Sequence, residues 1–247
     1  MGRLINSNSF KYAIKSESLY RKTPLWDFHV HTNFTDGKNS VEEMVEEALK
    51  RKISLLIFTE HTEPWLNHQE DWFKEYCAQI NFFKQKYRQE IELKIGIETP
   101  ATDYTGGLEM NDEMDKHSEF ILGAAHRYPG LGNRRVRDLN EQEAIDFEYN
   151  TLMALAENPK IDAIAHIGAT CSKYVESFPE KLTRNIIKTA AKNHIAIEIN
   201  QQYHQPLSAF INICMEEKAI ITLGSNAHRK EDIGNAAQEV KNLYQHE

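Results

Sequence analysis

Histidines and carboxylates recur at the ends of short apolar segments along this chain of 247 residues. Read in order, the segments end in HVH, TEH, GIE, AAH, IAH, EIN and GSNAH. The side chains there that could bind a metal or form a hydrogen bond are His29, His31, Glu60, His61, Glu98, His126, His166, Glu198, Asn200, Asn226 and His228. Mixed imidazole and carboxylate ligands favour Zn²⁺, Mn²⁺ or Fe²⁺. Because no cysteine belongs to this set, a thiolate site is excluded.

The apolar segments each have about the length of a buried strand. They cover residues 25–30, 53–59, 91–97, 119–125, 161–165, 194–199 and 219–223. Stretches with helical periodicity lie between or after them, at residues 40–52, 72–88, 142–157, 179–192, 207–218 and 235–244. The first of these opens with Ser40 and Glu43 at the spacing of a capping box, which predicts a helix start.

Regular alternation of buried strands and helices predicts an α/β fold with a parallel sheet. Seven units exceed the five or six strands that are typical of an open sheet, so we expect a distorted (β/α)7 barrel, closed or nearly closed. A doubly wound open sheet is the alternative. Barrels build their active sites at the carboxyl ends of the strands, where all the motifs lie. His29 and His31 can reach one ion together because residues i and i+2 of a strand point the same way.

Composition excludes several classes of protein. Lys and Arg number 29 and Asp and Glu number 37, so the net charge is −8 and no stable complex with nucleic acid is expected. The longest apolar run is far too short to cross a membrane, and the first residues lack the apolar core of a secretion signal. Three cysteines without a C-x-x-C pair indicate reduced, buried thiols and a cytoplasmic protein.

Residues 1–24 form an N-terminal extension, and residues 25–247 form one domain. The apolar residues of the extension would pack on the barrel or on a second subunit, which leaves a homo-oligomer open.

Seven motifs in this order resemble the PHP (polymerase and histidinol phosphatase) family of metal-dependent phosphoesterases. They are DFHVHTNFTDG (27–37), FTEHTEP (58–64), GIETP (96–100), GAAHRYPG (123–130), AIAHIGA (163–169), IEIN (197–200) and LGSNAHRKEDIG (223–234). The resemblance covers nearly the whole chain and implies a distorted seven-stranded barrel of the PHP type. It also implies two to three divalent ions, bound by His29, His31, Glu98 and Asn226, by Glu98, His126 and His166, and by Asp36, His61 and His228.

Two residues depart from the pattern of the family. Asn226 stands where the family usually has Asp, and its neutral amide is a weaker ligand. Glu60 stands where the family commonly has Asp, and the alternation of the strand points it away from His61. We therefore expect the first metal site to have a lower affinity or a different preferred ion, and we expect Glu60 to act at most through other residues.

The implied chemistry is hydrolysis of a small phosphate monoester by metal-activated hydroxide. Glu98 and His126 would be central to catalysis, and Arg127 and Arg229 would clamp the phosphate. An acid should protonate the leaving oxygen, and His204, Asp103 and Glu63 are all candidates for it. The composition of the chain does not choose among them.

Three other functions stay open at this stage. The same metals could serve a PHP nuclease or nucleotide phosphatase, although the net charge argues against long nucleic acids. Asn226 keeps open a degenerate PHP module that binds a ligand without catalysis. Hydrolysis of a C–N bond would need a catalytic Asp after the last strand, for which Asn226 is a poor substitute.

Overall fold

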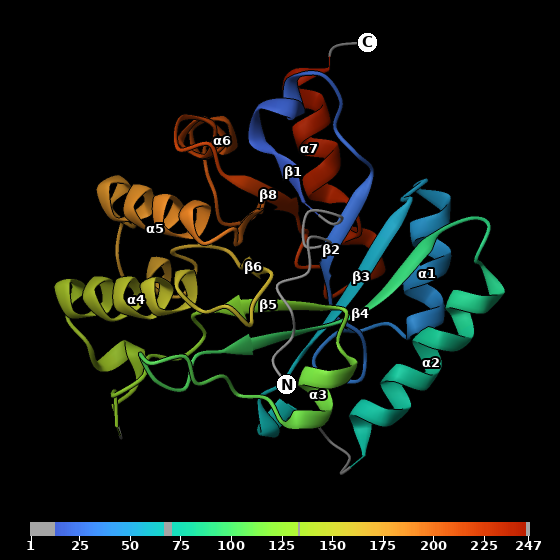
Figure 1. Cartoon of the computed structure of the whole chain (residues 1–247), viewed down its shortest axis with the longest axis horizontal. Helices are drawn as coiled ribbons and strands as arrows, with labels where there is room; N and C mark the ends of the chain where they lie inside the picture. Colours follow the sequence, from blue (N-terminus) through green and yellow to red (C-terminus); the bar gives the residue numbers. More distant parts are fainter. Residues whose placement is uncertain (1–12, 67–70, 133, 246–247) are drawn as a thin grey trace.

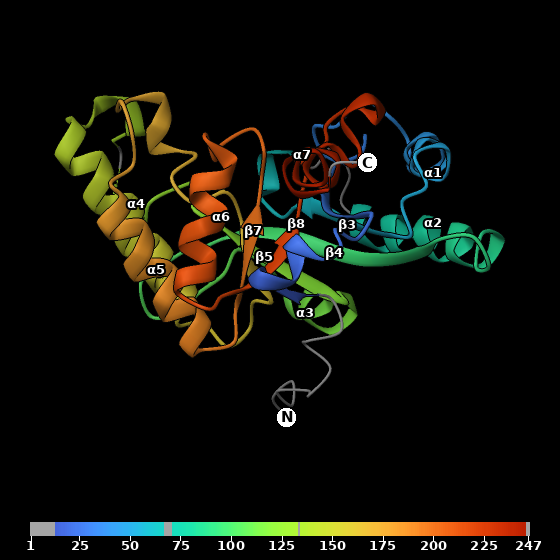
Figure 2. The same ribbon diagram turned by 90° about the horizontal axis from the view of Figure 1, so that it is seen from above.

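The computed structural model describes residues 13–66, 71–132 and 134–245. Its centre is one eight-stranded sheet, with helices on the outer side (Figures 1 and 2). The strands are β1 (Ile14–Lys15), β2 (Trp26–Val30), β3 (Leu55–His61), β4 (Glu92–Pro100), β5 (Phe120–Ala124), β6 (Ala163–Ile164), β7 (Ala196–Ile199) and β8 (Ile220–Leu223). Each of the seven predicted segments overlaps one of β2 to β8, with ends that differ by at most three residues.

The strand order is β1-β8-β7-β6-β5-β4-β3-β2, and all neighbours from β2 to β8 are parallel. The order follows the sequence without reversal, which excludes the doubly wound sheet. The far ends of the series meet after β8, where a bridge joins Val30 to Ala227. The backbone N–H of His31 donates to Ala227 O at 2.9 Å, and the N–H of Ala227 donates to His29 O at 3.1 Å. The expected distorted, nearly closed barrel is therefore confirmed.

The sheet also contains a strand that the sequence did not predict. β1 pairs antiparallel with β8, and Ile14 lies opposite Ile221. A two-residue strand is too short to show periodicity, which explains why it was missed. After it, the 3₁₀ helix η2 (Ser16–Tyr20) packs against α6 and α7. Four of the extension's apolar residues, Leu4, Ile5, Phe10 and Tyr12, lie outside the described residues. The domain boundary at residue 25 stays a prediction.

Helices α1 (Val41–Lys50), α2 (Trp72–Lys86), α4 (Glu141–Ala156), α5 (Glu180–Lys192), α6 (Leu207–Glu216) and α7 (Asn235–Tyr244) match the six predicted helices to within two residues at each end. α3 (Asp112–His117) is a short addition. The capping box of α1 is present: Glu43 N donates to Ser40 Oγ at 3.3 Å, and Ser40 N donates to the Glu43 carboxylate at 3.0 Å. In the described part of the chain, no helix has the length and apolar character needed to span a membrane.

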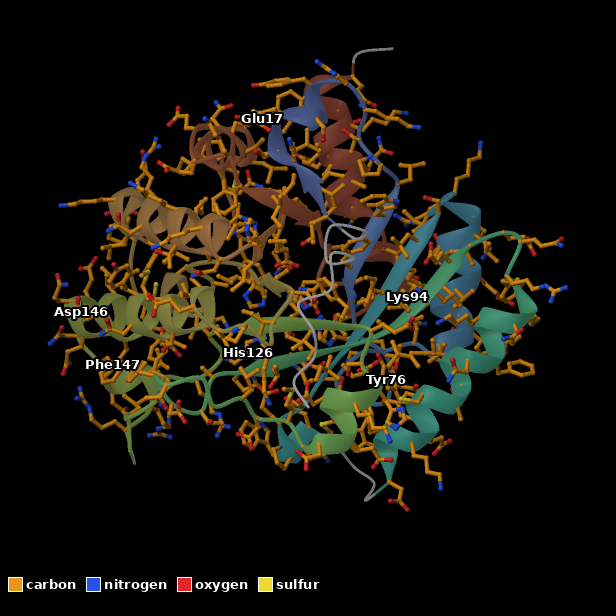
Figure 3. All side chains as sticks on the ribbon, in the orientation of Figure 1. Glu17, Tyr76, Lys94, His126, Asp146 and Phe147 are labelled. Carbon is orange, nitrogen blue, oxygen red and sulfur yellow. The ribbon has the colours of Figure 1, made fainter. Side chains whose placement is uncertain are left out.

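The helices cover the sheet in two groups. α4, α5 and α6 lie side by side over one half, and α1 and α2 lie over the other (Figures 1 and 2). Tyr76 of α2, labelled in Figure 3, fixes the second group because its hydroxyl donates to Gly96 O at 2.7 Å and to Phe58 O at 3.0 Å. Gly96 permits the close approach of β3 to β4, since an added Cβ would lie 2.7 Å from Phe58 O.

Alternation along the strands divides the apolar side chains between two faces of the sheet. Leu56 and Phe58 belong to the large core under the helices, whereas Leu55 and Ile57 belong to a separate cluster that fills the barrel interior. That interior cluster contains Ala124 of β5 and Ala196 of β7. The residues two positions further along, His126 and Glu198, continue on the same face. The interior is thus apolar toward the amino ends of the strands and polar toward their carboxyl ends.

Candidate metal centre

The carboxylate of Glu98 lies at the centre of a cluster of histidines. Glu98 belongs to β4 and is fully buried. Its Oε2 lies 3.2 Å from His29 Nε2, 3.4 Å from His31 Nε2 and 3.2 Å from His61 Nδ1. Its Oε1 lies 3.1 Å from His126 Nε2 and 3.0 Å from His166 Nε2. One carboxylate therefore faces five imidazoles, and Figure 3 shows His126 near the middle of the molecule.

The parallel barrel explains this convergence, because these side chains come from the carboxyl ends of β2 to β6. His29 lies within β2 and His31 follows it, and the pairing of β2 with β3 shifts register between Asp27 and Val30. The Nε2 atoms of His29 and His31 are 2.9 Å apart, so the two rings do reach one point. His61 ends β3, and His126 and His166 follow β5 and β6.

Ligand atoms gather in three groups within this cluster. One group consists of His31, Asp36, His61 and His228, a second of His29, Glu98 and His166, and a third of His61, Glu98 and His126. Eight of the nine expected metal ligands are thus brought together. The partition differs from the one implied by the family resemblance, because His31 joins the Asp36 group and His61 lies between two groups. Which ion each residue holds stays a prediction.

Asn226, the ninth expected ligand, lies in the turn after β8. Its backbone is left-handed, with φ of 54°, a conformation that Asn tolerates better than most residues. Its Oδ1 is buried and has no hydrogen-bond partner, while its Nδ2 lies 3.5 Å from Tyr203 Oη. Asn226 also lines the cavity above the cluster. An unpaired buried carbonyl oxygen at this place fits a ligand for a cation.

A second ring of acceptors orients the histidines. His29 Nδ1 lies 2.6 Å from Glu198 Oε1, and His126 Nδ1 lies 2.9 Å from Glu63 Oε1. His228 Nδ1 donates to the backbone carbonyl of Asn226 at 3.0 Å. In each case an oxygen acceptor faces Nδ1, so a proton held on Nδ1 would leave Nε2 as the atom available to a metal ion. Histidines that bind metals are typically held in this way.

The charges of the cluster depend on one another. Burial by itself would raise the pKa of Glu98, but His126, His29 and His61 hold it well below the usual value. Burial would lower the pKa of His126, but Glu98 and Glu63 raise it to about 10. Burial and three neighbouring imidazoles hold the pKa of His31 well below the usual value. A buried carboxylate among imidazoles, some neutral and some protonated, is the environment that a divalent cation would stabilise.

The residues therefore fit a metal site by their own chemistry. The donor atoms are imidazole nitrogens and carboxylate oxygens, and His31 Nδ1 and Glu98 Oε2 are buried without hydrogen bonds. This donor set suits Zn²⁺, Mn²⁺ or Fe²⁺. Buried polar atoms are normally hydrogen-bonded, so the clustering of these donor atoms fits the binding of a cation.

Glu60 behaves as expected. It is buried, and its Oε1 accepts hydrogen bonds from Thr32 N at 2.8 Å and Thr32 Oγ1 at 2.6 Å. Its Oε2 accepts a further bond from Thr35 Oγ1. The carboxylate thus fixes the loop that carries Asp36 and takes no place in the three groups of ligand atoms.

A cavity of about 390 Å³ opens above the cluster. It is lined by His61, Glu63, Trp65, Leu66, His126, Arg127, Val136, His166, Ala169, Thr170, Lys173, Tyr174, Tyr203, Asn226 and His228. Its volume falls within the range of small-ligand sites. Histidines form the floor, and cationic and aromatic side chains form the walls, which suits a small anionic ligand with a flat organic part.

Of the two arginines that were expected to bind phosphate, one lines the cavity and the other does not. Arg127 lines the cavity, its guanidinium contacts Glu109, and its Cζ lies 4.3 Å from the ring centroid of Trp65. Arg229 is exposed and is not among the lining residues. Its proposed contact with phosphate stays a prediction that this geometry does not support.

The three candidate acids are also placed differently. His204 is buried, stacks on Phe210 at a centroid distance of 3.6 Å and does not line the cavity. Burial lowers the pKa of His204 to about 3, so the ring is neutral near pH 7 and is not the imidazolium ion that a general acid requires. Asp103 Oδ1 accepts hydrogen bonds from Thr105 and Gly107 in an exposed turn. Glu63 is the one of the three that lines the cavity.

Sequence reasoning missed several residues of the site. Glu198 was noted at the end of its strand but received no role, although it holds His29. Lys173 lines the cavity without any motif that marks it. The inward position of Glu198 in β7, in line with Ala196, was the available signal. Nothing in the local sequence indicates that Lys173 reaches the site, because the connection after β6 that carries it has no regular periodicity.

The sequence pattern that defines the PHP domain matches residues 27–202. The chain belongs to the PHP family. This match spans β2 to the end of β7 and includes seven of the nine expected ligands. The turn that carries Asn226 and His228 follows it.

Proteins described as phosphatases resemble the chain over most of their length. A protein of Acetivibrio thermocellus described as a probable phosphatase is 24% identical over 221 residues, which cover 84% of this chain and 81% of that protein. A histidinol-phosphatase of Lactococcus lactis is 25% identical over 232 residues, which cover 82% of this chain and 83% of that protein.

A solved structure shows the same fold. It is the histidinol phosphate phosphatase of Lactococcus lactis in complex with zinc, L-histidinol and phosphate. The TM-score is 0.66 at 16% sequence identity, and the match covers 90% of this chain and 94% of that one. The PHP barrel deduced from strand order is therefore shared with a known phosphatase structure.

Proposed function

We propose that this protein is a metal-dependent phosphatase that hydrolyses a small phosphate monoester, with L-histidinol phosphate as the leading candidate substrate. The observation that carries the proposal is the buried Glu98 carboxylate, facing five imidazole nitrogens beneath a small cavity. The descriptions of the PHP relatives as phosphatases support the same reaction.

The three groups of ligand atoms would hold two to three ions of Zn²⁺, Mn²⁺ or Fe²⁺. When bound, such ions lower the pKa of water, so that hydroxide is available near neutral pH, and they bind phosphate oxygens. Glu98 reaches two of the three groups and balances part of the positive charge. Because the few carboxylates of the cluster do not balance two or three divalent ions, an anionic substrate is favoured.

Protein side chains on the cavity wall would bind the rest of the substrate. Arg127 can grip two phosphate oxygens through its planar guanidinium, and its contacts with Glu109 and Trp65 hold it in place. Lys173 adds a second positive charge to the same wall. Burial raises the pKa of Tyr203, so its hydroxyl stays protonated and can donate a hydrogen bond.

The leaving group needs a proton on its oxygen. Glu63 is the candidate acid that the geometry favours, because it lines the cavity, whereas His204 and Asp103 do not. Its Oε1 bonds to His126 Nδ1 at 2.9 Å. We assign Glu63 this role on position alone.

The size and lining of the cavity support a compact substrate. Trp65 and Tyr174 expose apolar ring surface at its rim, which suits a flat group such as imidazole. The net charge of −8 disfavours long polyanions, and the cavity is too small for a duplex. A single phosphorylated metabolite with a ring fits better than a nucleic acid.

The test combines metal analysis with phosphate release. Protein purified without chelator is expected to contain two to three divalent ions per chain and to release phosphate from L-histidinol phosphate faster than from mononucleotides or aliphatic phosphomonoesters. His126→Ala should abolish turnover and retain the fold, and the exposed His117→Ala should change neither property. A protein that binds no Zn²⁺, Mn²⁺ or Fe²⁺ and releases no phosphate would contradict the proposal.

A further inference from the structure

Two adjacent loops supply much of the cavity wall. The loop after β5 carries His126 and Arg127, and the loop after β6 carries His166, Thr170 and Lys173. The second loop contains only a short 3₁₀ helix, η5 (Cys171–Lys173). Because side chains from both loops would contact one substrate, the relative position of the loops must be held by something outside them.

A buried carboxylate on α4 contacts both loops. Glu148 is 1% exposed, and its Oε2 accepts a hydrogen bond from Tyr128 Oη at 2.6 Å. Tyr128 follows Arg127 directly. The same Oε2 accepts from Cys171 N at 2.5 Å, and Oε1 accepts from Thr170 N at 3.4 Å. The Glu148 carboxylate therefore joins the loop after β5 to the loop after β6.

The local backbone explains why an acceptor is needed at this point. The first N–H groups of a helix have no partner within the helix. Thr170, at the start of η5, provides no side-chain cap. Glu148 supplies the missing acceptor from a neighbouring helix. Without it, the Cys171 N–H would be buried and unpaired, which is unfavourable.

Apolar packing also holds the loop after β6 on α4, but it does not fix the exact position of the loop. Cys171 and Val175 form a small cluster with Ala144 and Ile145 of α4. Such contacts are non-directional, and they would tolerate sliding of the loop along the helix. Sliding would, however, break the hydrogen bonds of 2.5 and 2.6 Å that the two loops donate to one Glu148 oxygen.

We propose that Glu148 is a positioning residue for the substrate site. By hydrogen bonding to the two loops that carry Arg127 and Lys173, it holds both loops on α4 and fixes the position of these two side chains relative to each other. This role rests on the proposed phosphatase function. Glu148 contacts none of the expected metal ligands, so it acts on binding of the substrate and not on binding of the metal.

Four variants test the role. Glu148→Ala removes all three hydrogen bonds. Glu148→Gln keeps one oxygen that can accept from both Tyr128 and Cys171, and it serves as the conservative rescue. Tyr128→Phe removes one bond and keeps the stacking on Phe147. Asp146→Asn is the matched control, because Asp146 is an exposed acid on the outer side of the same helix (Figure 3).

The kinetic readout separates positioning from mere stability. In Glu148→Ala we expect KM for the phosphomonoester to rise about tenfold or more, with metal content per chain unchanged, since small displacements of binding groups weaken binding strongly. Tyr128→Phe should show a smaller rise and keeps the test valid if Glu148→Ala does not fold. Glu148→Gln and Asp146→Asn should stay near the wild-type KM. An unchanged KM in both Glu148→Ala and Tyr128→Phe, or a loss of metal in either, would overturn the role.

A second readout does not depend on activity. Amide hydrogen exchange at Thr170 and Cys171 should be faster in Glu148→Ala than in the wild type, and unchanged in Asp146→Asn. Equal exchange rates in Glu148→Ala and the wild type would refute the proposal that Glu148 holds this loop in place. If the wild type hydrolyses no phosphomonoester, the proposed function fails on its own. The affinity of the metal-loaded protein for inorganic phosphate then replaces KM, with the same expected weakening.

Discussion

The Glu198 carboxylate and the His29 imidazole meet across the barrel, with Glu198 Oε1 2.6 Å from His29 Nδ1. They come from β7 and β2, and they meet over Gly224, which directly follows β8. A Cβ at Gly224 would lie 2.1 Å from Glu198 Oε1 and 2.8 Å from His29 Cβ. Glu198 Oε2 also accepts the backbone N–H of His166 at 2.7 Å. One buried carboxylate thus sets the position of two expected metal ligands.

This relationship predicts that Gly224→Ala disturbs the metal centre although Gly224 binds nothing. The added methyl group would push Glu198 away from His29 and release the ring. We expect metal affinity to fall by about 10- to 100-fold, as for other residues that orient metal-bound histidines. Glu198→Gln should cause a loss in the same range, because it replaces the charged acceptor. Equilibrium dialysis against Zn²⁺ measures both, and wild-type affinity in both variants would contradict the role of Glu198.

Glu98→Gln should reduce metal binding and phosphatase activity more than any other single substitution. The variant keeps the shape of the side chain but loses the charge that faces five imidazoles. We expect metal content to drop and phosphate release to fall by more than about a hundredfold. Near-UV circular dichroism should remain native-like. The matched control is His194→Asn, at an exposed position with φ of 60°, where asparagine is tolerated. Full activity in Glu98→Gln would rule out the assigned centre.

Asn226→Asp should change metal binding in the opposite direction. The new carboxylate would place a negative charge where an unpaired amide oxygen now faces the cavity. Aspartate also tolerates the left-handed backbone at this position. We expect the variant to retain metal about tenfold more tightly against a competing chelator. Equal retention would show that residue 226 does not act as a ligand.

The pH dependence of thiol reactivity provides a test away from the metal centre. Burial, with Glu113 and Glu119 nearby, raises the pKa of Cys77 to about 11. At pH 8 roughly one thousandth of this thiol is ionised, against about a tenth at its ordinary value. Native protein should therefore react with iodoacetamide about a hundredfold more slowly than a free thiol, and the rate should rise steadily above pH 8. Fast alkylation at pH 8 would show that the thiol is not protected.

Much of the fold could be predicted from sequence, because its signals are local. Each of β2 to β8 is visible in the sequence as a short apolar run, and the spacing of Ser40 and Glu43 predicts the start of α1. β1 could not be found in this way, since two residues carry no period. Its place beside β8 depends on a pairing with Ile221, more than 200 positions away.

The candidate ligands were also within reach of the sequence. The carboxyl ends of parallel strands share one edge of the barrel, so a polar residue at each strand end predicts convergence without coordinates. This reasoning found Glu98 and its histidines. It also placed His204 at the active face, because it could not tell that a loop folds back and buries the ring against Phe210.

The sequence by itself therefore determined the barrel, the family and the set of residues that gather at one end. Only the tertiary structure decided how that set divides, with His31 beside Asp36, Glu198 behind His29 and Glu148 between two loops. The physical reason is distance along the chain. Periodicity reports on neighbours a few positions apart, whereas these contacts join distant segments and depend on how the barrel curves and how closely its side chains pack.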